Sequence, residues 1–398
     1  MNKYINGPIN AVRLEGTIYG NKKIIYIYMD QHVNVLQQTE CSELSNDFNN
    51  YINNEMGKIT NRTIDFFLEI GRTSIYNDIY KYRNRYIDEI GKFFIKTIQI
   101  KEGKNIGTRY GPNIRFHWID IRDYFKSQIN LYLDTIISII INIRCDMRIK
   151  IDTIEELHNT LLKLNEKILF IINLFDKKIT NMRGGTKPIN YEDDINKNII
   201  NIMTKINNKY THPDLYKKLH IIYKIIIKSF MSIIEQINNL LVIISDFILY
   251  IKKFMKDKDH LNSLNKTKDG HLTYGIDYIN NIEVINTLYI KIIKLDDAIT
   301  IAFSLLVDMF FLRRFLDKDY IKNAIVYTGI AHSIQYIYIL IKEFDMTITH
   351  ASYLKYDINK TTNIIKNSTE INNTINELFY PPKLIQCTDI TNFPENFE

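Results

Sequence analysis

Two histidines far apart in the sequence, His32 and His332, each follow a short apolar run that predicts a buried strand. The first run ends in Asp30-Gln-His32 and the second in Gly329-Ile-Ala-His332. Polar residues at the carboxyl ends of buried strands are typical of active sites in α/β proteins, because ligands bind in the crevice outside those strand ends. We therefore expect the two ends of the chain to build one site.

Two further polar clusters follow predicted strands, Glu69-Ile-Gly-Arg72 and Asp120-Ile-Arg122. Glu69 lies in an otherwise apolar strand, where an unpaired carboxylate is costly. It therefore needs a metal, a cation or a hydrogen-bond donor, and a bidentate ion pair with Arg72 or Arg122 is the simplest structural explanation. A structural ion pair and a functional role are both compatible with this pattern.

The residue types favour hydrolysis. Two imidazoles and a carboxylate are the ligand set of many catalytic metal sites, which keep an open position for water. With His32, Glu69 and His332 as ligands, zinc, manganese or cobalt would activate that water and polarise a carbonyl group in an amide or ester. In a metal-free alternative a histidine is the general base, Glu69 orients it, and Arg72 or Arg122 stabilises the oxyanion.

Each histidine also has a structural explanation. A lone histidine after a strand is more often a helix cap or a hydrogen-bonded structural residue than a catalyst. Gly329 could precede the second helix only because the turn there needs a positive φ. The occurrence of two such histidines nevertheless favours function, with Asp30, Asp120 and Gly329 as supporting residues.

The elements that must position these residues alternate between strand and helix in residues 1–125 and 316–351, which predicts parallel βαβ units. In residues 126–315 apolar side chains recur every three or four positions, which predicts helices. We predict an α/β (α+β) fold with a split, mainly parallel sheet and flanking helices, interrupted by this large all-helical insertion. The polar tail, 352–398, is expected to be loosely packed.

Composition excludes several classes. The 398 residues include 51 basic and 45 acidic side chains, interspersed, and give no nucleic-acid footprint. Cys41, Cys145 and Cys387 are widely spaced and odd in number, which argues against a disulfide framework or a zinc ribbon and suits a reducing compartment. The N-terminus lacks a signal-peptide core, and charged residues break the longest apolar stretch, 219–255. We expect a soluble intracellular protein without a membrane span.

Two motifs resemble a known family. Gly329-Ile-Ala-His332, followed by an apolar helix and a closing strand, resembles the C-terminal Gly-x-x-His motif of the TIKI/TraB/GumN proteins, which are related to the ChaN and erythromycin-esterase-like folds. Asp30-Gln-His32 after a strand is similar to the N-terminal motif of the same group. The resemblance implies that the motifs surround a single cleft.

The glutamate and nearby arginine of that group look like Glu69 and Arg72. The resemblance implies metal-dependent peptidase activity or esterase-like activity. The sequence departs from the family pattern at Met29, which stands where the family carries a glycine three residues before the histidine. This departure leaves a degenerate pseudoenzyme as an alternative.

The whole chain also resembles uncharacterised proteins of giant DNA viruses that infect amoebae, through segments such as Val12-Arg-Leu-Glu-Gly16 and Ile348-Thr-His350. That resemblance implies host cytoplasm or the virion as the location. The leading hypothesis is a viral hydrolase with an unknown peptide or ester substrate. The alternative is a catalytically inactive structural or interaction protein that binds a protein partner through residues 126–315.

Overall fold

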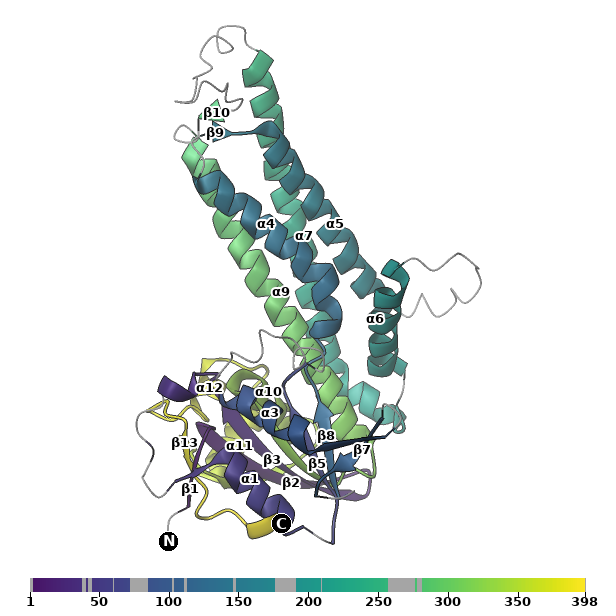
Figure 1. Ribbon diagram of the computed structural model, residues 1–398, viewed down its shortest axis with the longest axis vertical. Helices are drawn as coiled ribbons and strands as arrows, with labels where there is room; N and C mark the ends of the chain where they lie inside the picture. Colours follow the sequence, from purple (N-terminus) through teal and green to yellow (C-terminus); the bar gives the residue numbers. More distant parts are fainter. Residues whose placement is uncertain are drawn as a thin grey trace, which may run out of the picture. The chain divides into compact units, whose positions relative to one another are not determined.

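The structure, a computed structural model, describes most of the chain in two compact units (Figure 1). The α/β unit comprises Met1–Asp123, Tyr210–Leu219 and Val307–Glu398, and the helical unit comprises Tyr124–Lys209 and His220–Leu306. The described residues are 3–37, 41, 45–59, 61–71, 85–101, 104–110, 113–145, 148–175, 191–208, 210–256, 276–277 and 281–397.

A six-stranded sheet forms the centre of the α/β unit. Its strands lie in the order β12-β2-β3-β11-β5-β8. Their bounds are β2 Asn10–Ile18, β3 Asn21–Asp30, β5 Ile64–Leu68, β8 Ile114–Trp118, β11 Asn323–Gly329 and β12 Thr347–Ala351. β2 and β3 form a hairpin with its turn at Tyr19-Gly20, where both residues have positive φ, +49° and +78°.

The sheet is mixed, which corrects the expectation of a mainly parallel sheet. β3, β11, β5 and β8 run parallel to one another, but β2 pairs antiparallel with both β3 and β12. The tight turn after β2 explains the difference, because a two-residue connection can join only antiparallel strands. A strand from the C-terminal part of the chain nevertheless lies between two strands from the N-terminal part, since β11 lies between β3 and β5.

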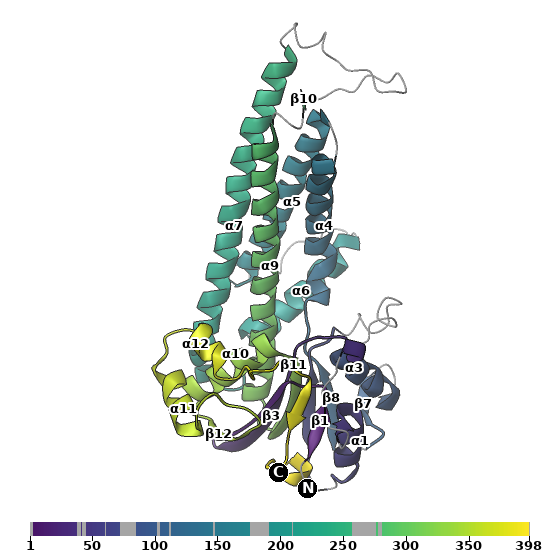
Figure 2. The same ribbon diagram turned by 90° about the vertical axis from the view of Figure 1, so that its left-hand side faces the viewer.

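Helices cover both faces of this sheet (Figures 1 and 2). On one face, Phe48 of α1 (Phe48–Gly57) packs on Tyr28, and Phe94 of α3 (Tyr86–Thr97) packs on Phe66. On the other face, α10 (Ile330–Lys342) and the C-terminal end of α9 (Ile282–Asp317) cover the sheet, and Phe311 of α9 contacts Phe67. The alternation of strand side chains thus supplies two buried faces.

The C-terminal segment is more ordered than its polar composition predicts. It contains α11 (Ile358–Asn367), α12 (Asn373–Glu377), β13 (Cys387–Asp389) and a 3-10 turn, Glu395–Phe397. β13 pairs antiparallel with β1 (Tyr4–Asn6), which also pairs with β4 (Asn46–Asp47). Apolar side chains such as Ile365, Phe379 and Phe397 are buried. The expectation of a loosely packed tail was therefore wrong, because a few well-spaced apolar residues are enough to anchor it.

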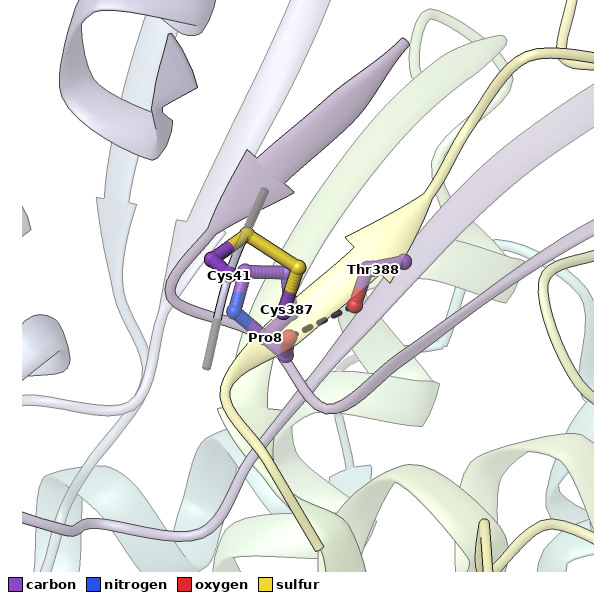
Figure 3. The surroundings of a disulfide bond; sticks show 4 residues. All are labelled: Pro8, Cys41, Cys387 and Thr388. Atoms are coloured by element: carbon purple, nitrogen blue, oxygen red, sulfur yellow. Dashed lines mark hydrogen bonds between the residues drawn. A yellow bond between two sulfur atoms is a disulfide. The ribbon is translucent and has the colours of Figure 1, made fainter. Parts of the chain in front are cut away.

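A disulfide joins Cys41 to Cys387 (Figure 3). The spacing argument against disulfides was wrong for this pair, because residues 346 positions apart in sequence meet only through the tertiary fold. Cys145 is a free, exposed thiol. The odd cysteine count thus reflects one bridge and one unpaired residue.

The helical unit is built from long helices that run side by side in both views (Figures 1 and 2). It contains α4 (Asp123–Cys145), α5 (Ile151–Phe175), α6 (Tyr191–Asn208) and most of α7 (Pro213–Lys256) and α9. A short pair, β9 (Arg148–Ile149) and β10 (Ile276–Asp277), joins their connections, and β6 (Ile98–Lys101) and β7 (Lys104–Thr108) form a further pair in the α/β unit. The predicted helical character of this region is confirmed.

Among the described helices, α7 is long and apolar enough to cross a membrane by length and composition, since an 18-residue window within Pro213–Lys253 has a mean hydropathy of 1.5. Because a core helix of a soluble protein has the same length and composition, the expectation of no membrane span stays a prediction. Ile226, Phe230, Ile233 and Ile237 of α7 are fully buried. Their spacing is that of a helix whose apolar stripe contributes to the core of a bundle.

Candidate functional site

Four parallel strands, β3, β11, β5 and β8, end at the same edge of the sheet. Asp30, the last residue of β3, pairs in register with Gly329, the last residue of β11. Glu69 directly follows β5, and Asp120 lies just beyond β8. The polar clusters predicted at strand ends therefore lie at one edge, where α/β folds commonly bind ligands.

Asp30 holds the His32 side chain. Nδ1 of His32 lies 2.6 Å from Oδ2 of Asp30, and the main-chain N–H of His32 donates to the same oxygen at 3.1 Å. His32 has a left-handed φ of +59°, which costs about 1–2 kcal/mol and is offset here by these two hydrogen bonds. The imidazole is 34% exposed, in contrast to the fully buried Asp30.

The surroundings of His32 favour its protonated form. Burial by itself lowers the pKa of His32, but the hydrogen bond to Asp30 and the negative charge of Glu69 raise it above the ordinary value of 6.5. Oε2 of Glu69 lies 3.9 Å from Nε2 of His32, beyond hydrogen-bond distance. The Asp30–His32 pair is therefore a polarised imidazole whose Nε2 can exchange a proton with a bound water or substrate.

Glu69 is buried, and both of its carboxylate oxygens are bound. Oε1 accepts a hydrogen bond from Nη2 of Arg122 at 2.8 Å and lies 3.1 Å from Nε2 of His332. Oε2 accepts the main-chain N–H of Gly329 at 2.8 Å. Burial would raise the pKa of Glu69, but His332 and Arg122 lower it well below its ordinary value. Glu69 is therefore an anion at neutral pH.

His332, in the first turn of α10, lies between two carboxylates. Its Nδ1 is 2.5 Å from Oδ1 of Asp308 in α9, and its Nε2 faces Glu69. Burial lowers the pKa of His332, but the charges of Asp308 and Glu69 raise it well above the ordinary value of 6.5. An imidazole that donates to a carboxylate from each nitrogen is an imidazolium, so His332 carries a fixed positive charge.

Arg122 links Glu69 to Asp120. Its Nε donates to Oδ1 of Asp120 at 2.8 Å and its Nη2 to Oδ2 at 3.0 Å, so the bidentate pair is made with Asp120. Glu69 receives a single hydrogen bond from the same guanidinium. The expectation of a bidentate pair on Glu69 is therefore corrected. Arg72, the other candidate partner, lies outside the described residues.

A glycine is needed at position 329 because a side chain would not fit there, and not because the backbone adopts a conformation that only glycine tolerates. Its φ is −55°, which any residue adopts, so the explanation by a positive φ is wrong. A Cβ atom at position 329 would lie 2.8 Å from Nε2 of His32 and 3.4 Å from Oε2 of Glu69. Because 2.8 Å is closer than carbon and nitrogen approach without bonding, any side chain here would displace the His32 imidazole.

The sequence analysis missed Asp308 and Gln386, which both contact the site. Asp308 is 3% exposed and pairs with His332, and Gln386 is 3% exposed and donates to Asp30. A signal for Asp308 was available, because it is a lone carboxylate in the apolar run Leu305-Leu-Val-Asp-Met-Phe-Phe311. Its burial follows from the same argument that singled out Glu69. Gln386 had no comparable signal.

A metal would compete with the hydrogen bonds of this site. Among the described residues, no group of three or more His, Cys, Asp or Glu side chains is arranged as a metal site. The imidazolium form of His332 has no lone pair for a metal, and Arg122 holds a positive charge against Glu69. This protonation state corresponds to the metal-free alternative. Zinc, manganese or cobalt on His32, Glu69 and His332 stays a prediction that requires His332 to release its proton.

The chain is similar along its whole length to proteins of a virus of amoebae. The model of a family of unknown function (DUF5847) matches residues 3–398. "Uncharacterized protein R706" of Acanthamoeba polyphaga mimivirus is 32% identical, over 100% of this chain and 97% of the relative. "Uncharacterized protein R161" of the same virus is 33% identical, over 99% of this chain and 98% of the relative. No solved structure matches the chain.

Proposed function

Since the chain belongs to the DUF5847 family of unknown function, we propose its activity from the site itself: hydrolysis of an ester or amide bond with His32 as the general base. The observation that carries this proposal is the Asp30–His32 pair, in which Asp30 fixes Nδ1 at 2.6 Å and His32 remains partly exposed. A histidine held in this way by a buried carboxylate is a common general base.

In the proposed reaction a water attacks the substrate carbonyl carbon while Nε2 of His32 takes its proton. The carbonyl oxygen becomes an oxyanion, and collapse of the tetrahedral intermediate breaks the bond to the leaving alcohol or amine. His32 returns the proton to that leaving group. Arg122, whose side chain is 28% exposed beside Glu69, contributes positive charge to the developing oxyanion.

The family resemblance supports this proposal. The motifs similar to those of the TIKI/TraB/GumN and erythromycin-esterase-like proteins contain His32, Glu69 and His332, which meet at one edge of the sheet. Met29, the departure from the family pattern, is fully buried within β3. Its side chain thus occupies core space.

The mimivirus relatives support a location in an infected host cell or in the virion. Of these two, the Cys41–Cys387 disulfide favours the virion, because a reducing cytosol disfavours disulfides.

A panel of chromogenic short-chain esters and aminoacyl anilides tests the activity directly. We expect wild type to hydrolyse at least one class, and His32→Gln to lose about 10²–10⁴-fold of that rate, as is typical for loss of a general base. His158→Gln, a change in the helical unit, is the matched control. The proposal fails when wild type and His32→Gln hydrolyse every compound at the same rate.

Metal analysis of the same samples separates the two versions of the chemistry. The metal-free mechanism predicts that hydrolysis survives exhaustive chelation and that elemental mass spectrometry finds no stoichiometric metal. Zinc, manganese or cobalt that is bound by wild type and lost in both His32→Ala and His332→Ala would establish the metal-dependent version instead.

The alternative proposal is an inactive protein that binds a protein partner through its helical unit. It is favoured by exposed apolar side chains on α7, since Met231, Val242 and Leu249 are 53%, 61% and 65% exposed. These residues are separated by nearly whole numbers of helical turns and therefore share one face. Cross-linking from this face to a viral or host protein, together with a negative hydrolysis panel, would favour the alternative.

A further inference from the structure

Gln386 brings the C-terminal segment into the site. Its buried carboxamide donates from Nε2 to Oδ1 of Asp30 at 2.7 Å and also to the main-chain carbonyl of Gly7. The other oxygen of the same carboxylate, Oδ2, is the one that faces His32. The two oxygens of Asp30 are thus divided between the C-terminal segment and the imidazole.

The main chain around Gln386 is anchored on both sides. Its carbonyl accepts the N–H of Gly7 at 2.9 Å, and the next residue, Cys387, is joined to Cys41. Beyond the disulfide, Oγ1 of Thr388 donates to the carbonyl of Pro8 at 2.6 Å (Figure 3). Because these bonds fix the backbone, the Gln386 amide presents its N–H to Asp30 in one orientation.

We propose that Gln386 is a positioning residue for the Asp30–His32 pair. A carboxylate rotates readily about its terminal torsion, and only some rotations place Oδ2 in line with Nδ1 of His32. The amide donor selects that rotation at 2.7 Å, whereas the hydroxyl of Tyr327, the other donor to Oδ1, lies at 3.3 Å. Gln386 therefore sets the direction in which His32 presents Nε2.

This inference rests on the proposed function only for its effect on catalysis, because the geometry of the Asp30–His32 pair can be measured without a substrate. A short hydrogen bond between Nδ1 of His32 and Asp30 shifts the N–H proton far downfield in NMR spectra. In protein labelled with ¹⁵N-histidine, the His32 signal is assigned by its absence in His32→Gln. The Nδ1–H signal of His332 serves as an internal reference.

The test compares Gln386→Met with Thr388→Val. Methionine preserves the length and volume of glutamine but removes the donor. Thr388→Val removes one buried hydrogen bond from β13, two residues further along the chain, without touching Asp30. We expect the downfield His32 signal to disappear or move upfield in Gln386→Met and to be retained in Thr388→Val. Hydrolysis should fall about 10- to 100-fold in Gln386→Met alone, as for other residues that orient a catalytic side chain.

An unchanged His32 signal in folded Gln386→Met would overturn the inference, as would equal losses of signal in both variants. Should Gln386→Met not fold, Gln386→Asn decides the question, because its amide is one methylene too short to reach Asp30 and predicts the same loss. The two proposals fail separately. The hydrolysis proposal fails on the substrate panel, and the positioning role fails on the N–H signal.

Discussion

The site contains two Asp–His pairs that use the same chemical groups in opposite ways. In the first, Asp30 binds one nitrogen of His32, and the imidazole is 34% exposed. In the second, Asp308 and Glu69 bind both nitrogens of His332, and the imidazole is 9% exposed. Glu69 lies between the two pairs and faces both imidazoles.

This difference shows that the number of carboxylates bonded to an imidazole decides whether the ring can transfer a proton. One carboxylate polarises the ring and leaves the second nitrogen available for proton transfer. Two carboxylates fix the proton and convert the ring into a permanent cation. We therefore assign proton transfer to His32 and a fixed charge to His332.

The largest expected effect is the loss of hydrolysis in Asp30→Asn. Without the carboxylate, the His32 imidazole loses both its orientation and its raised proton affinity. We expect kcat/KM to fall about 10²–10⁴-fold, in the range for general acid–base catalysis, with a small change in thermal stability. Steady-state kinetics on the best substrate of the ester and anilide panel measures the effect.

The matched variant for that prediction is Asp308→Asn. It should lose stability and retain more of the hydrolysis rate than Asp30→Asn, because His332 takes no part in proton transfer. An equal or greater loss of kcat/KM in folded Asp308→Asn would remove the distinction between the two pairs.

Glu69→Gln is expected to cause the largest loss of stability. Removal of this charge leaves Arg122 and the His332 imidazolium without their shared partner in a buried environment. We expect the free energy of unfolding to fall by about 3–5 kcal/mol, as for other broken buried ion pairs. Urea denaturation followed by circular dichroism measures it.

Glu155→Gln provides the control for Glu69→Gln. Its ion pair with Lys252 is exposed, with the two side chains 41% and 51% accessible, so its loss should cost about 1 kcal/mol or less. Comparable losses in the two variants would show that Glu69 does not connect a buried network.

Gly329→Ala tests whether space at the end of β11 matters. The added Cβ would meet Nε2 of His32 at 2.8 Å, whereas the backbone at φ −55° tolerates alanine. We expect roughly a 10²-fold loss of kcat/KM through displacement of the imidazole by less than about 1 Å, with near-normal stability. Full activity of Gly329→Ala would mean that His32 need not occupy its present position.

The smallest effect is the pH dependence contributed by His332. Because its pKa is raised on folding, the stabilisation that it provides is complete below the unfolded value of 6.5 and is lost as the pH rises through the folded value. The difference in unfolding free energy between wild type and His332→Gln should therefore be largest below the unfolded value of 6.5 and shrink as the pH rises through the raised pKa of folded His332. Each pH unit by which folding raises the pKa of His332 corresponds to about 1.4 kcal/mol of unfolding free energy. A difference that grows with pH would contradict the raised pKa.

Much of this arrangement follows from local sequence patterns. The apolar runs before His32 and His332 predicted β3 and β11, and a carboxylate in an apolar strand identified Glu69 as a buried charge. These signals are local, because strand burial and helix periodicity depend on neighbouring residues. The antiparallel pairing of β12 with β2 escaped the fold prediction, since strand pairing depends on tertiary contacts.

The rest of the site depends on contacts that no local pattern encodes. Asp308 lies in a long helix and meets His332 only when the end of that helix packs on the sheet. Gln386 and Cys387 lie in a polar segment without periodicity, and their partners, Asp30 and Cys41, are more than 300 positions earlier in the chain. Such pairings arise from topology, and composition argued against them.

Histidine NMR titration tests the central distinction most directly. Uniformly ¹⁵N-labelled wild type is titrated, and the ring signals are assigned with His32→Gln and His332→Gln. We predict that His32 loses its proton first, while His332 stays doubly protonated to a clearly higher pH. Deprotonation of His332 at or below the pH at which His32 titrates would contradict the assignment of proton transfer to one pair and fixed charge to the other.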